Sequence, residues 1–214
     1  MRDLISFEGI DGAGKSTQIQ MLAAKYRSHH QPVVIVREPG GTELGESIRR
    51  LLLESKGKMS IKAELLLFAA SRAQLVNDVV VPALENFEVV IMDRFYDSTT
   101  AYQGYGRGVD VDMIDRINQF AADYWEPSVT FLLRLDPDEM MARKRSKDGK
   151  VGELDRMEQA GIEFFRKVSN GYGMIAKKHP NRFCVLDASE PPDEIHKKIC
   201  GELESRKNRR PNWP

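Results

Sequence analysis

A glycine-rich octapeptide near the amino terminus has the residue types and spacing that bind nucleotide phosphates. The run 9–16, GIDGAGKS, fits the pattern G-x-x-x-x-G-K-[ST]. Its glycines let backbone N–H groups wrap closely around an anion, and a helix after it would add the positive end of its dipole. Lys15 can reach the β- and γ-phosphates, and the Ser16 hydroxyl can ligate Mg²⁺. The candidate phosphate-binding residues are Gly9, Asp11, Gly12, Ala13, Gly14, Lys15, Ser16 and Thr17.

Asp11 is unusual inside such a loop, because a carboxylate repels phosphate unless it faces elsewhere. One interpretation is that it points at a sugar hydroxyl or a metal-bound water. The other is that it is a solvent-facing turn residue. The sequence leaves both open.

A second candidate is Asp93-Arg94, which follows the apolar run 89–92. Ligands of doubly wound folds collect at the carboxyl ends of strands, so an acid here can hold Mg²⁺ opposite Ser16. The adjacent arginine can bind a phosphate through two N–H groups. A hydrolytic enzyme often has a second acid at this position to orient water. An arginine instead favours binding of a phosphorylated acceptor.

Two further segments offer groups that suit a nucleobase. Phe68 and Arg72 are four residues apart and share a helical face, where a ring can stack and a guanidinium can donate to a carbonyl. The stretch 98–108 offers hydroxyls, an aromatic ring and Gln103, whose amide both donates and accepts. The plainer alternatives are a core phenylalanine, a surface arginine and a polar loop with glycine turns.

A short basic segment lies past the middle of the chain. A mobile lid of this kind could close over ATP and stabilise charge on the transferring phosphoryl group. The alternative is a solvated helix end. The segment contains Arg143, Lys144, Arg145, Lys147, Lys150 and Arg156.

The elements that must position these residues alternate between short β-branched runs and longer helical periods, which predicts an α/β fold with a parallel sheet of about five strands and helices on both faces. The expected strands are 4–7, 33–36, 89–92, 129–135 and 183–186. The expected helices are 15–28, 42–54, 61–86 with a kink or a new segment at Pro82, 111–124, 138–147, 154–178 and 192–205. We expect one domain over 1–205 and a flexible basic tail over 206–214.

The composition of the chain argues against a nucleic-acid-binding or membrane protein. The 214 residues carry 32 Lys+Arg and 32 Asp+Glu, so a formal net charge of zero gives no bulk attraction to nucleic acid or membrane. The longest apolar run, 65–70, is far shorter than the roughly 20 residues that span a bilayer. We therefore expect a cytoplasmic protein with no membrane or nucleic-acid partner.

Taken together, five segments resemble the thymidylate kinase family. They are FEGIDGAGKST at 7–17, REPGGTELGESIR at 37–49, LLLFAASRAQ at 65–74, DRFYDSTTAYQGYGRG at 93–108 and GELDRME at 152–158. The first is generic, whereas REPGGT followed by DR-x-x-x-S-x-x-AYQG is highly specific. Gly12 in the phosphate loop together with a basic lid resembles the bacterial subtype, in which the lid supplies the catalytic arginine.

The resemblance implies the P-loop kinase fold, a homodimer, and Mg²⁺-dependent transfer of a phosphoryl group from ATP to dTMP for dTTP synthesis. Arg94 would bind the dTMP phosphate, with Arg37, Glu38 and Arg49 nearby. Phe68 would stack on thymine, and Arg72, Thr99 and Gln103 would contact its edge. Tyr102 would crowd the 2′ position, Asp11 would meet the 3′-hydroxyl, and Arg143 would lie near adenine. The implied catalytic residues are Lys15, Asp93, Arg94, Arg145 and Lys147.

This chain departs from the family pattern at the lid, expected at about 143–153. The additional stretch Asp148–Val151 separates the basic run from GELDR. The closed lid therefore has three candidate cations, Arg145, Lys147 and Lys150. The rival functions are another nucleoside-monophosphate kinase, a nucleotide-dependent switch and a non-catalytic nucleotide-binding module. A GTPase switch should carry N-K-x-D, which this sequence lacks.

Overall fold

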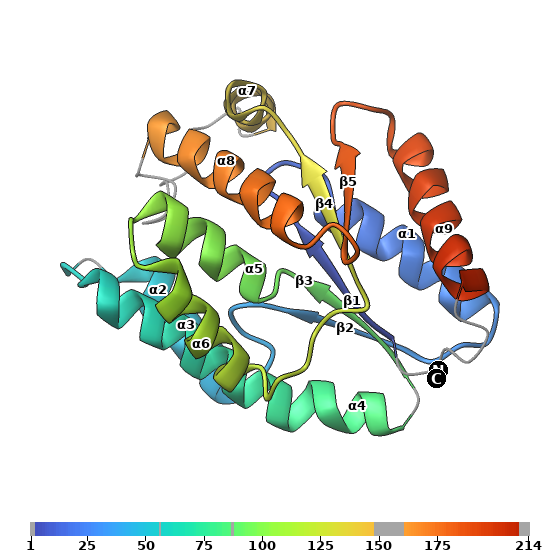
Figure 1. Cartoon of the computed structure of the whole chain (residues 1–214), viewed down its shortest axis with the longest axis horizontal. Coiled ribbons are helices and arrows are strands. Elements are labelled where there is room, and N and C mark those ends of the chain that lie inside the picture. The colour runs from blue at the N-terminus through green and yellow to red at the C-terminus, as the bar shows by residue number, and fades with distance from the viewer. Residues whose placement is uncertain (1–2, 56, 87, 148–160, 210–214) are drawn as a thin grey trace.

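The structure is a computed structural model that describes residues 3–55, 57–86, 88–147 and 161–209, with no side chains described for 144–147 and 209. Five parallel strands form one sheet in the order β2-β3-β1-β4-β5, as Figure 1 shows. This confirms the predicted α/β class. The strands are β1 (Asp3–Glu8), β2 (Val33–Arg37), β3 (Val89–Asp93), β4 (Val129–Arg134) and β5 (Phe183–Asp187).

Helices cover both faces of the sheet. Helices α1 and α9 pack together on one face, and α3 with α4, α5 and α8 lie on the other, with α2 and α6 packed against α3 (Figure 1). The helices are α1 (Lys15–Ser28), α2 (Glu43–Glu54), α3 (Ile61–Leu75), α4 (Val81–Glu85), α5 (Tyr96–Thr99), α6 (Val111–Ala121), α7 (Pro137–Lys147), α8 (Ile162–Lys178) and α9 (Pro192–Arg209). Two π-helical segments, Val76–Val80 and Thr100–Gly106, follow α3 and α5.

Alternation along the central strands divides the core between the two faces. Ile5 and Phe7 pack with α1, whereas Leu4 packs with the α3–α4 side. Leu4 shares its face with Ser6 and Glu8, two fully buried polar residues. The register Phe7↔Asp93 brings the ends of β1 and β3 side by side, which places the two predicted phosphate-binding segments at one edge of the sheet.

Several predicted boundaries shift for local reasons. Pro82 lies directly after the π-helical segment, within a helical run that continues from Ile61 to Glu85, so the run changes its helical form just before the proline but does not end there. Helix α6 ends at Ala121 rather than 124, because Asp123 and Tyr124 adopt left-handed backbone conformations. Helix α8 begins after Gly161, which has a positive φ, and not at 154; residues 154–160 lie outside the described ranges.

Two interpretations need correction. The stretch 98–108 is not a loop, since most of it is helical in α5 and the π-helical segment 100–106. Of the flexible tail expected over 206–214, residues 206–209 are part of α9, and 210–214 lie outside the described residues. Arg206 holds this end of α9 in place by donating to the carbonyl oxygens of Ser128 at 3.1 Å and Asn181 at 2.8 Å.

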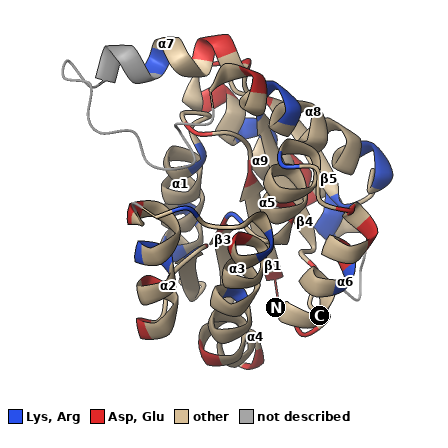
Figure 2. Cartoon of the chain, turned by 90° about the vertical axis from the view of Figure 1, so that its left-hand side faces the viewer, with Lys and Arg blue, Asp and Glu red and all other residues tan. Residues whose placement is uncertain are grey.

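Charges and apolar runs on this fold agree with an ordinary globular surface. Basic and acidic residues are interspersed along the helices in Figure 2. Among the described residues, one helical run, Ile61–Glu85, is long and apolar enough to cross a membrane. Its Leu65, Leu75 and Leu84 are buried inside the protein.

Candidate active site

The glycine-rich loop joins β1 to α1, as its chemistry requires. Gly9 has a φ of 136°, and a Cβ there would lie 2.4 Å from the carbonyl oxygen of Leu133, so only glycine fits. Gly14, with a φ of 87°, is the N-cap of α1, whose first turn exposes Ser16 and Thr17. The loop therefore presents the N-terminus of a 14-residue helix to an anion.

Lys15 lies folded across this loop. Its Nζ donates to the carbonyl oxygens of Gly9 and Ile10, each at 3.0 Å. Burial, reinforced by the nearby Arg94 guanidinium, lowers the pKa of Lys15 to about 8. An arriving polyphosphate would favour the charged ammonium and offer better acceptors than two neutral carbonyls.

Ser16 and Asp93 meet across the ends of α1 and β3. The Ser16 hydroxyl donates to Oδ2 of Asp93 at 3.3 Å, although 77 residues separate them in sequence. A hydroxyl and a carboxylate are oxygen ligands of the kind that Mg²⁺ takes, and this ion commonly uses one or two protein oxygens plus substrate phosphates. In the described part of the chain, no group of three or more His, Cys, Asp or Glu forms a closed metal site. The pair fits Mg²⁺ bound together with a nucleotide.

Arg94 lies where the phosphate loop meets a second cavity. Its Nη1 donates to the carbonyl oxygen of Gly9 at 2.9 Å, and its Nη2 pairs with Asp11 Oδ1 at 2.5 Å. Its guanidinium also lies 5.4 Å from the centre of the Tyr102 ring. Asp11 thus faces the arginine and not the phosphate cradle. This pairing resolves how a carboxylate can occupy the loop without repelling the nucleotide.

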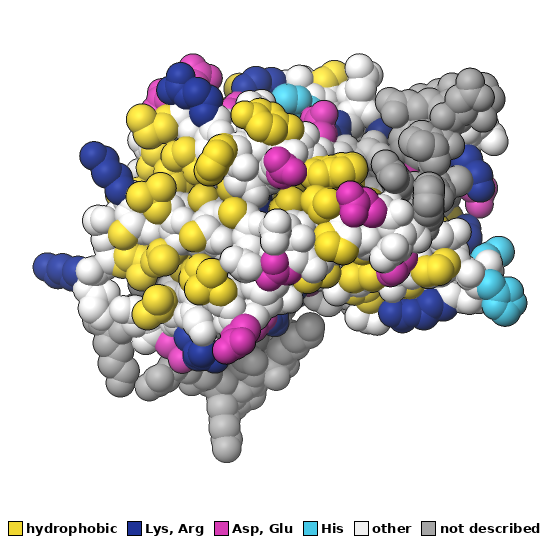
Figure 3. All heavy atoms as spheres, turned by 90° about the horizontal axis from the view of Figure 1, so that it is seen from below, with side chains coloured by type: hydrophobic (Ala, Val, Ile, Leu, Met, Phe, Trp, Pro, Cys, Tyr) yellow, Lys and Arg dark blue, Asp and Glu magenta, His cyan; other side chains and the backbone are white. Residues whose placement is uncertain are grey.

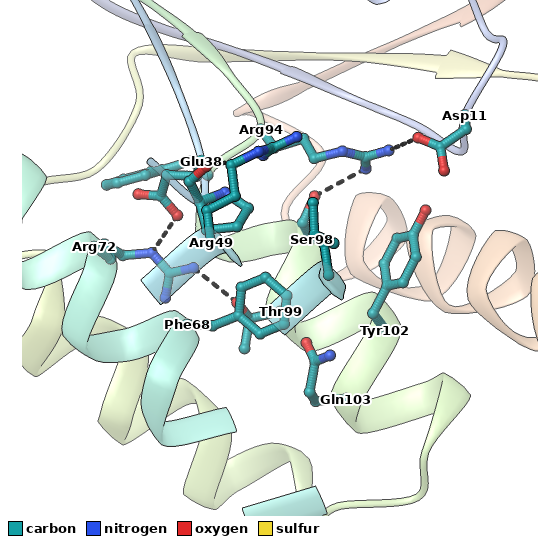
Figure 4. A pocket seen from close by; sticks show the side chains of 13 residues that line it. Asp11, Glu38, Arg49, Phe68, Arg72, Arg94, Ser98, Thr99, Tyr102 and Gln103 are labelled. Atoms are coloured by element: carbon teal, nitrogen blue, oxygen red, sulfur yellow. Dashed lines mark hydrogen bonds and ion pairs between the residues drawn. The ribbon is translucent and has the colours of Figure 1, made fainter. Parts of the chain in front are cut away.

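The second cavity, of about 640 Å³ including its open mouth, gathers most of the predicted nucleotide contacts (Figure 4). Nine of the ten candidates line it: Asp11, Glu38, Arg49, Phe68, Arg72, Arg94, Thr99, Tyr102 and Gln103. Arg37 does not line it. Its half-exposed side chain pairs with Glu46 at 3.1 Å.

Arg72 forms the floor of one end of this cavity. Arg72 is only 1% exposed, so the alternative that it is a surface arginine is wrong. Its Nε, Nη1 and Nη2 donate to Glu38 at 2.9 Å, Asn118 at 2.8 Å and Thr99 at 2.7 Å, respectively. A guanidinium has five N–H donors, so these three bonds do not use all of them. Phe68, on the same face of α3, points into the cavity beside it (Figure 4).

The sequence analysis did not identify Glu8 and Tyr172 as site residues. Together with Ser98, they form the hydrogen-bonded support of the Arg94 side chain. Glu8 is fully buried and accepts from Ser98 Oγ at 2.6 Å and from the Tyr172 hydroxyl at 2.8 Å. Its other oxygen accepts the backbone N–H of Phe95 at 2.7 Å. Burial, with repulsion from Asp97, raises the pKa of Glu8 to about 7. The sequence did contain one signal for Glu8, because a serine and a glutamate alternate with apolar residues in a strand that is predicted to be buried.

The lid candidates are only partly placed. Arg143 of α7 donates to the carbonyl oxygens of Gly12 at 3.1 Å and Ala188 at 2.8 Å, so it bridges the phosphate loop and the loop after β5. Arg145 and Lys147 belong to α7, but their side chains lie outside the described residues, as do Lys150 and the rest of the lid to 153.

A phosphate cradle on a 2-3-1-4-5 parallel sheet, beside a cavity for a second nucleotide, defines a P-loop nucleotide kinase. The family model for thymidylate kinase matches residues 7–199. Thymidylate kinases from Chlorobaculum tepidum and Prosthecochloris aestuarii are 51% and 50% identical, covering 94% and 95% of this chain and 97% and 93% of theirs. The crystal structure of thymidylate kinase from Ehrlichia chaffeensis superimposes with a TM-score of 0.77 at 36% identity, covering 95% of this chain and 98% of that one.

The chain therefore belongs to the thymidylate kinase family. It transfers the γ-phosphoryl group of ATP to dTMP, giving dTDP and ADP. The resemblance stated from five sequence segments is confirmed over nearly the whole chain.

Proposed function

We propose that dTMP occupies the cavity of Figure 4 and that ATP occupies the phosphate loop, with Arg94 joining the two sites. The observation that carries this assignment is the position of Arg94. One nitrogen of its guanidinium touches the loop at Gly9, while its side chain lines the cavity. A dTMP phosphate held there lies next to the γ-phosphate, which is the positioning that phosphoryl transfer requires.

At the phosphate end, Arg94 binds the dTMP phosphate and Arg49 assists from α2. Arg49 lines the cavity and is anchored by its own bond to the Pro39 carbonyl oxygen at 2.9 Å. Arg37 lies outside the cavity and binds the phosphate after it releases Glu46. Breaking that ion pair costs little free energy, because both side chains are exposed. Asp11 meets the 3′-hydroxyl region, and Tyr102 crowds the 2′ position against ribonucleotides.

At the base end, Phe68 stacks on thymine and Arg72 donates to its O4 carbonyl. Thr99 and Gln103 contact the remaining polar edge, with Glu38 fixing the arginine from the far side. Buried polar groups of this kind reject a base that leaves them unpaired, which is the basis of selectivity.

Mg²⁺ is held by Ser16 and by Asp93, in part through water. When bound, the ion would neutralise the negative charge that develops during phosphoryl transfer. Lys15 leaves its two carbonyl partners to bind the β- and γ-phosphates. Gly12, Ala13, Gly14 and Thr17 line the cradle.

The lid, at about 143–153, closes over ATP. Arg143 lies on the adenine side, as its position between Gly12 and Ala188 supports. Arg145 or Lys147 supplies transition-state charge, with Lys150 as the third candidate. Closure also excludes water as an acceptor.

The protein acts as a cytoplasmic homodimer of a single kinase domain. Helix α3 exposes an apolar stripe of Ala63, Leu66, Ala70 and Ala73, and its neighbours expose Leu51 and Phe120. Figure 3 shows hydrophobic side chains gathered over this side of the molecule. Small residues on an exposed helix suit close packing against the same helix of a second copy.

The test is ADP formation from Mg-ATP with a panel of dTMP, dUMP, dCMP, dGMP, UMP and AMP. We expect strong selectivity for dTMP and loss of activity in both Lys15→Ala and Arg94→Ala. Exposed Glu85→Gln at the end of α4 is the control and should behave as the unaltered enzyme. ATP hydrolysis at the same rate with every monophosphate and without one would instead support a nucleotide-dependent switch.

A further inference from the structure

Gln103, which contacts the cavity, is itself held by a buried acid. Its Nε2 donates to Oε1 of Glu64 at 2.7 Å, joining the π-helical segment 100–106 to α3. Both residues are 1% exposed. Arg107 Nε lies 3.6 Å from the same carboxylate oxygen, and its guanidinium lies 4.7 Å from the centre of the Phe164 ring. Glu64 therefore lies between a fixed cation and an amide.

This contact sets which end of the amide faces the cavity. An ionised carboxylate only accepts hydrogen bonds, so the NH₂ group of Gln103 must face Glu64. The amide oxygen is left on the cavity side, and Figure 4 shows it directed toward Phe68 and Thr99. Gln103 consequently presents an acceptor to the base.

An acceptor at this position discriminates between pyrimidines. Thymine and uracil carry an N3–H donor, whereas cytosine carries a bare N3 that only accepts. A carbonyl oxygen facing N3 is paired in the first case and repelled in the second. If the amide could turn over, its NH₂ group would match cytosine instead. Selectivity at N3 therefore depends on whatever prevents that rotation.

We propose that Glu64, which pairs with Arg107, is a specificity-determining positioning residue that locks the Gln103 amide to accept from N3–H. Glu64 touches no part of the substrate and acts through Gln103. The inference rests on the proposed contact between Gln103 and the base. It assigns part of the preference for dTMP over dCMP to a residue beneath the cavity wall.

The experiment compares kcat/KM for dTMP, dUMP and dCMP in Glu64→Gln, Glu64→Met and Gln103→Met, with exposed Glu85→Gln as the control. The glutamine side chain introduced by Glu64→Gln can donate or accept, and the methionine side chain introduced by Glu64→Met forms no comparable hydrogen bond. Both substitutions therefore free the Gln103 amide. We expect the dTMP/dCMP ratio to fall about tenfold, the worth of one hydrogen bond, in both Glu64 variants. The dTMP/dUMP ratio should not change, because both bases carry N3–H.

Each outcome has one interpretation. Loss of packing alone would lower kcat/KM for dTMP and dCMP by the same factor, and an unchanged ratio in Glu64→Gln overturns the proposal even if Glu64→Met fails to fold. An unchanged dTMP/dCMP ratio in Gln103→Met would instead overturn the contact between Gln103 and the base. A lower ratio in Gln103→Met but not in Glu64→Gln would leave that contact intact and remove only the role of Glu64.

Discussion

The Tyr172 hydroxyl donates to Oε2 of Glu8 at 2.8 Å, linking α8 to the first strand across 164 residues of sequence. Ser98 Oγ donates to the same oxygen at 2.6 Å. Arg94 Nη1 in turn donates to both hydroxyls, at 3.2 and 3.3 Å. The two hydroxyls also lie 2.8 Å apart, so one of them can donate to the other. The guanidinium, the two hydroxyls and the buried carboxylate thus form one hydrogen-bonded network, in which Glu8 positions the hydroxyls beside Arg94.

Replacing Glu8 with glutamine should disrupt these hydrogen bonds, because an amide places a donor where the carboxylate only accepts. Either amide orientation sets an NH₂ group against a donor, because Oε1 accepts from Phe95 N–H and Oε2 from the two hydroxyls. Arg94 then loses its fixed partners. We expect KM for dTMP to rise about tenfold in Glu8→Gln and roughly threefold in Tyr172→Phe, with a smaller change in kcat. Steady-state kinetics at saturating ATP measures both.

Tyr26→Phe is the matched control for the tyrosine variant, since Tyr26 lies in α1 on the other face of the sheet. Its KM for dTMP should match that of the unaltered enzyme. A fall in kcat with unchanged KM in Glu8→Gln would contradict a positioning role through Arg94.

Glu8 should also leave a signature in the pH dependence of stability. Its pKa is raised to about 7 in the folded protein, from 4.5. Between these values the folded state keeps a proton that the unfolded state releases, so this contribution to stability falls as pH rises from 4.5 to 7. Burying the ionised form costs on the order of 3 kcal/mol above this window. The stability advantage of the unaltered protein over Glu8→Gln should therefore shrink as pH rises across it.

Urea unfolding at a series of pH values from about 5 to about 8 measures the difference in unfolding free energy between the unaltered protein and Glu8→Gln. This difference should decrease up to about pH 7 and then stay level. Parallel pH profiles for the two proteins would show that Glu8 titrates normally.

The sequence predicted the parts of this site that bind through a motif, and it missed the parts that act through contact between distant segments. The phosphate loop and Asp93-Arg94 each follow a strand, so strand order alone brings them together. Glu8 and Asn118 are single polar residues within apolar periods. Their importance depends on which side chain lies opposite, and periodicity carries no such information. The helical form of 98–108 was hidden because its glycines suggest turns, whereas extensive packing against α8 stabilises the π-helical part.

The contact between Ser16 and Asp93 predicts a metal-specific defect. Ser16→Ala and Asp93→Asn each weaken one of the two proposed oxygen ligands. We expect kcat to fall at least about a hundredfold, because the ion stabilises charge mainly in the transition state. The Mg²⁺ concentration for half-maximal rate should rise, while KM for dTMP changes little. A Mg²⁺ titration at fixed nucleotide concentrations measures these effects, with Ser28→Ala at the far end of α1 as the control. An unaltered Mg²⁺ requirement in both variants would exclude the pair as metal ligands.

The exposed stripe on α3 predicts how two copies associate. Ala70 lies in the middle of the stripe, one turn beyond Leu66, which is 58% exposed. A glutamate at position 70 would place two like charges at the centre of a symmetric interface, where residue and partner face each other. We expect Ala70→Glu to convert a dimer into a monomer in light scattering coupled to size exclusion. Met174→Glu on α8, where Met174 is 52% exposed, should leave the dimer intact. Because α3 also carries Phe68 and Arg72, the monomer should bind dTMP more weakly. A dimer that survives Ala70→Glu but not Met174→Glu would place the interface on α8.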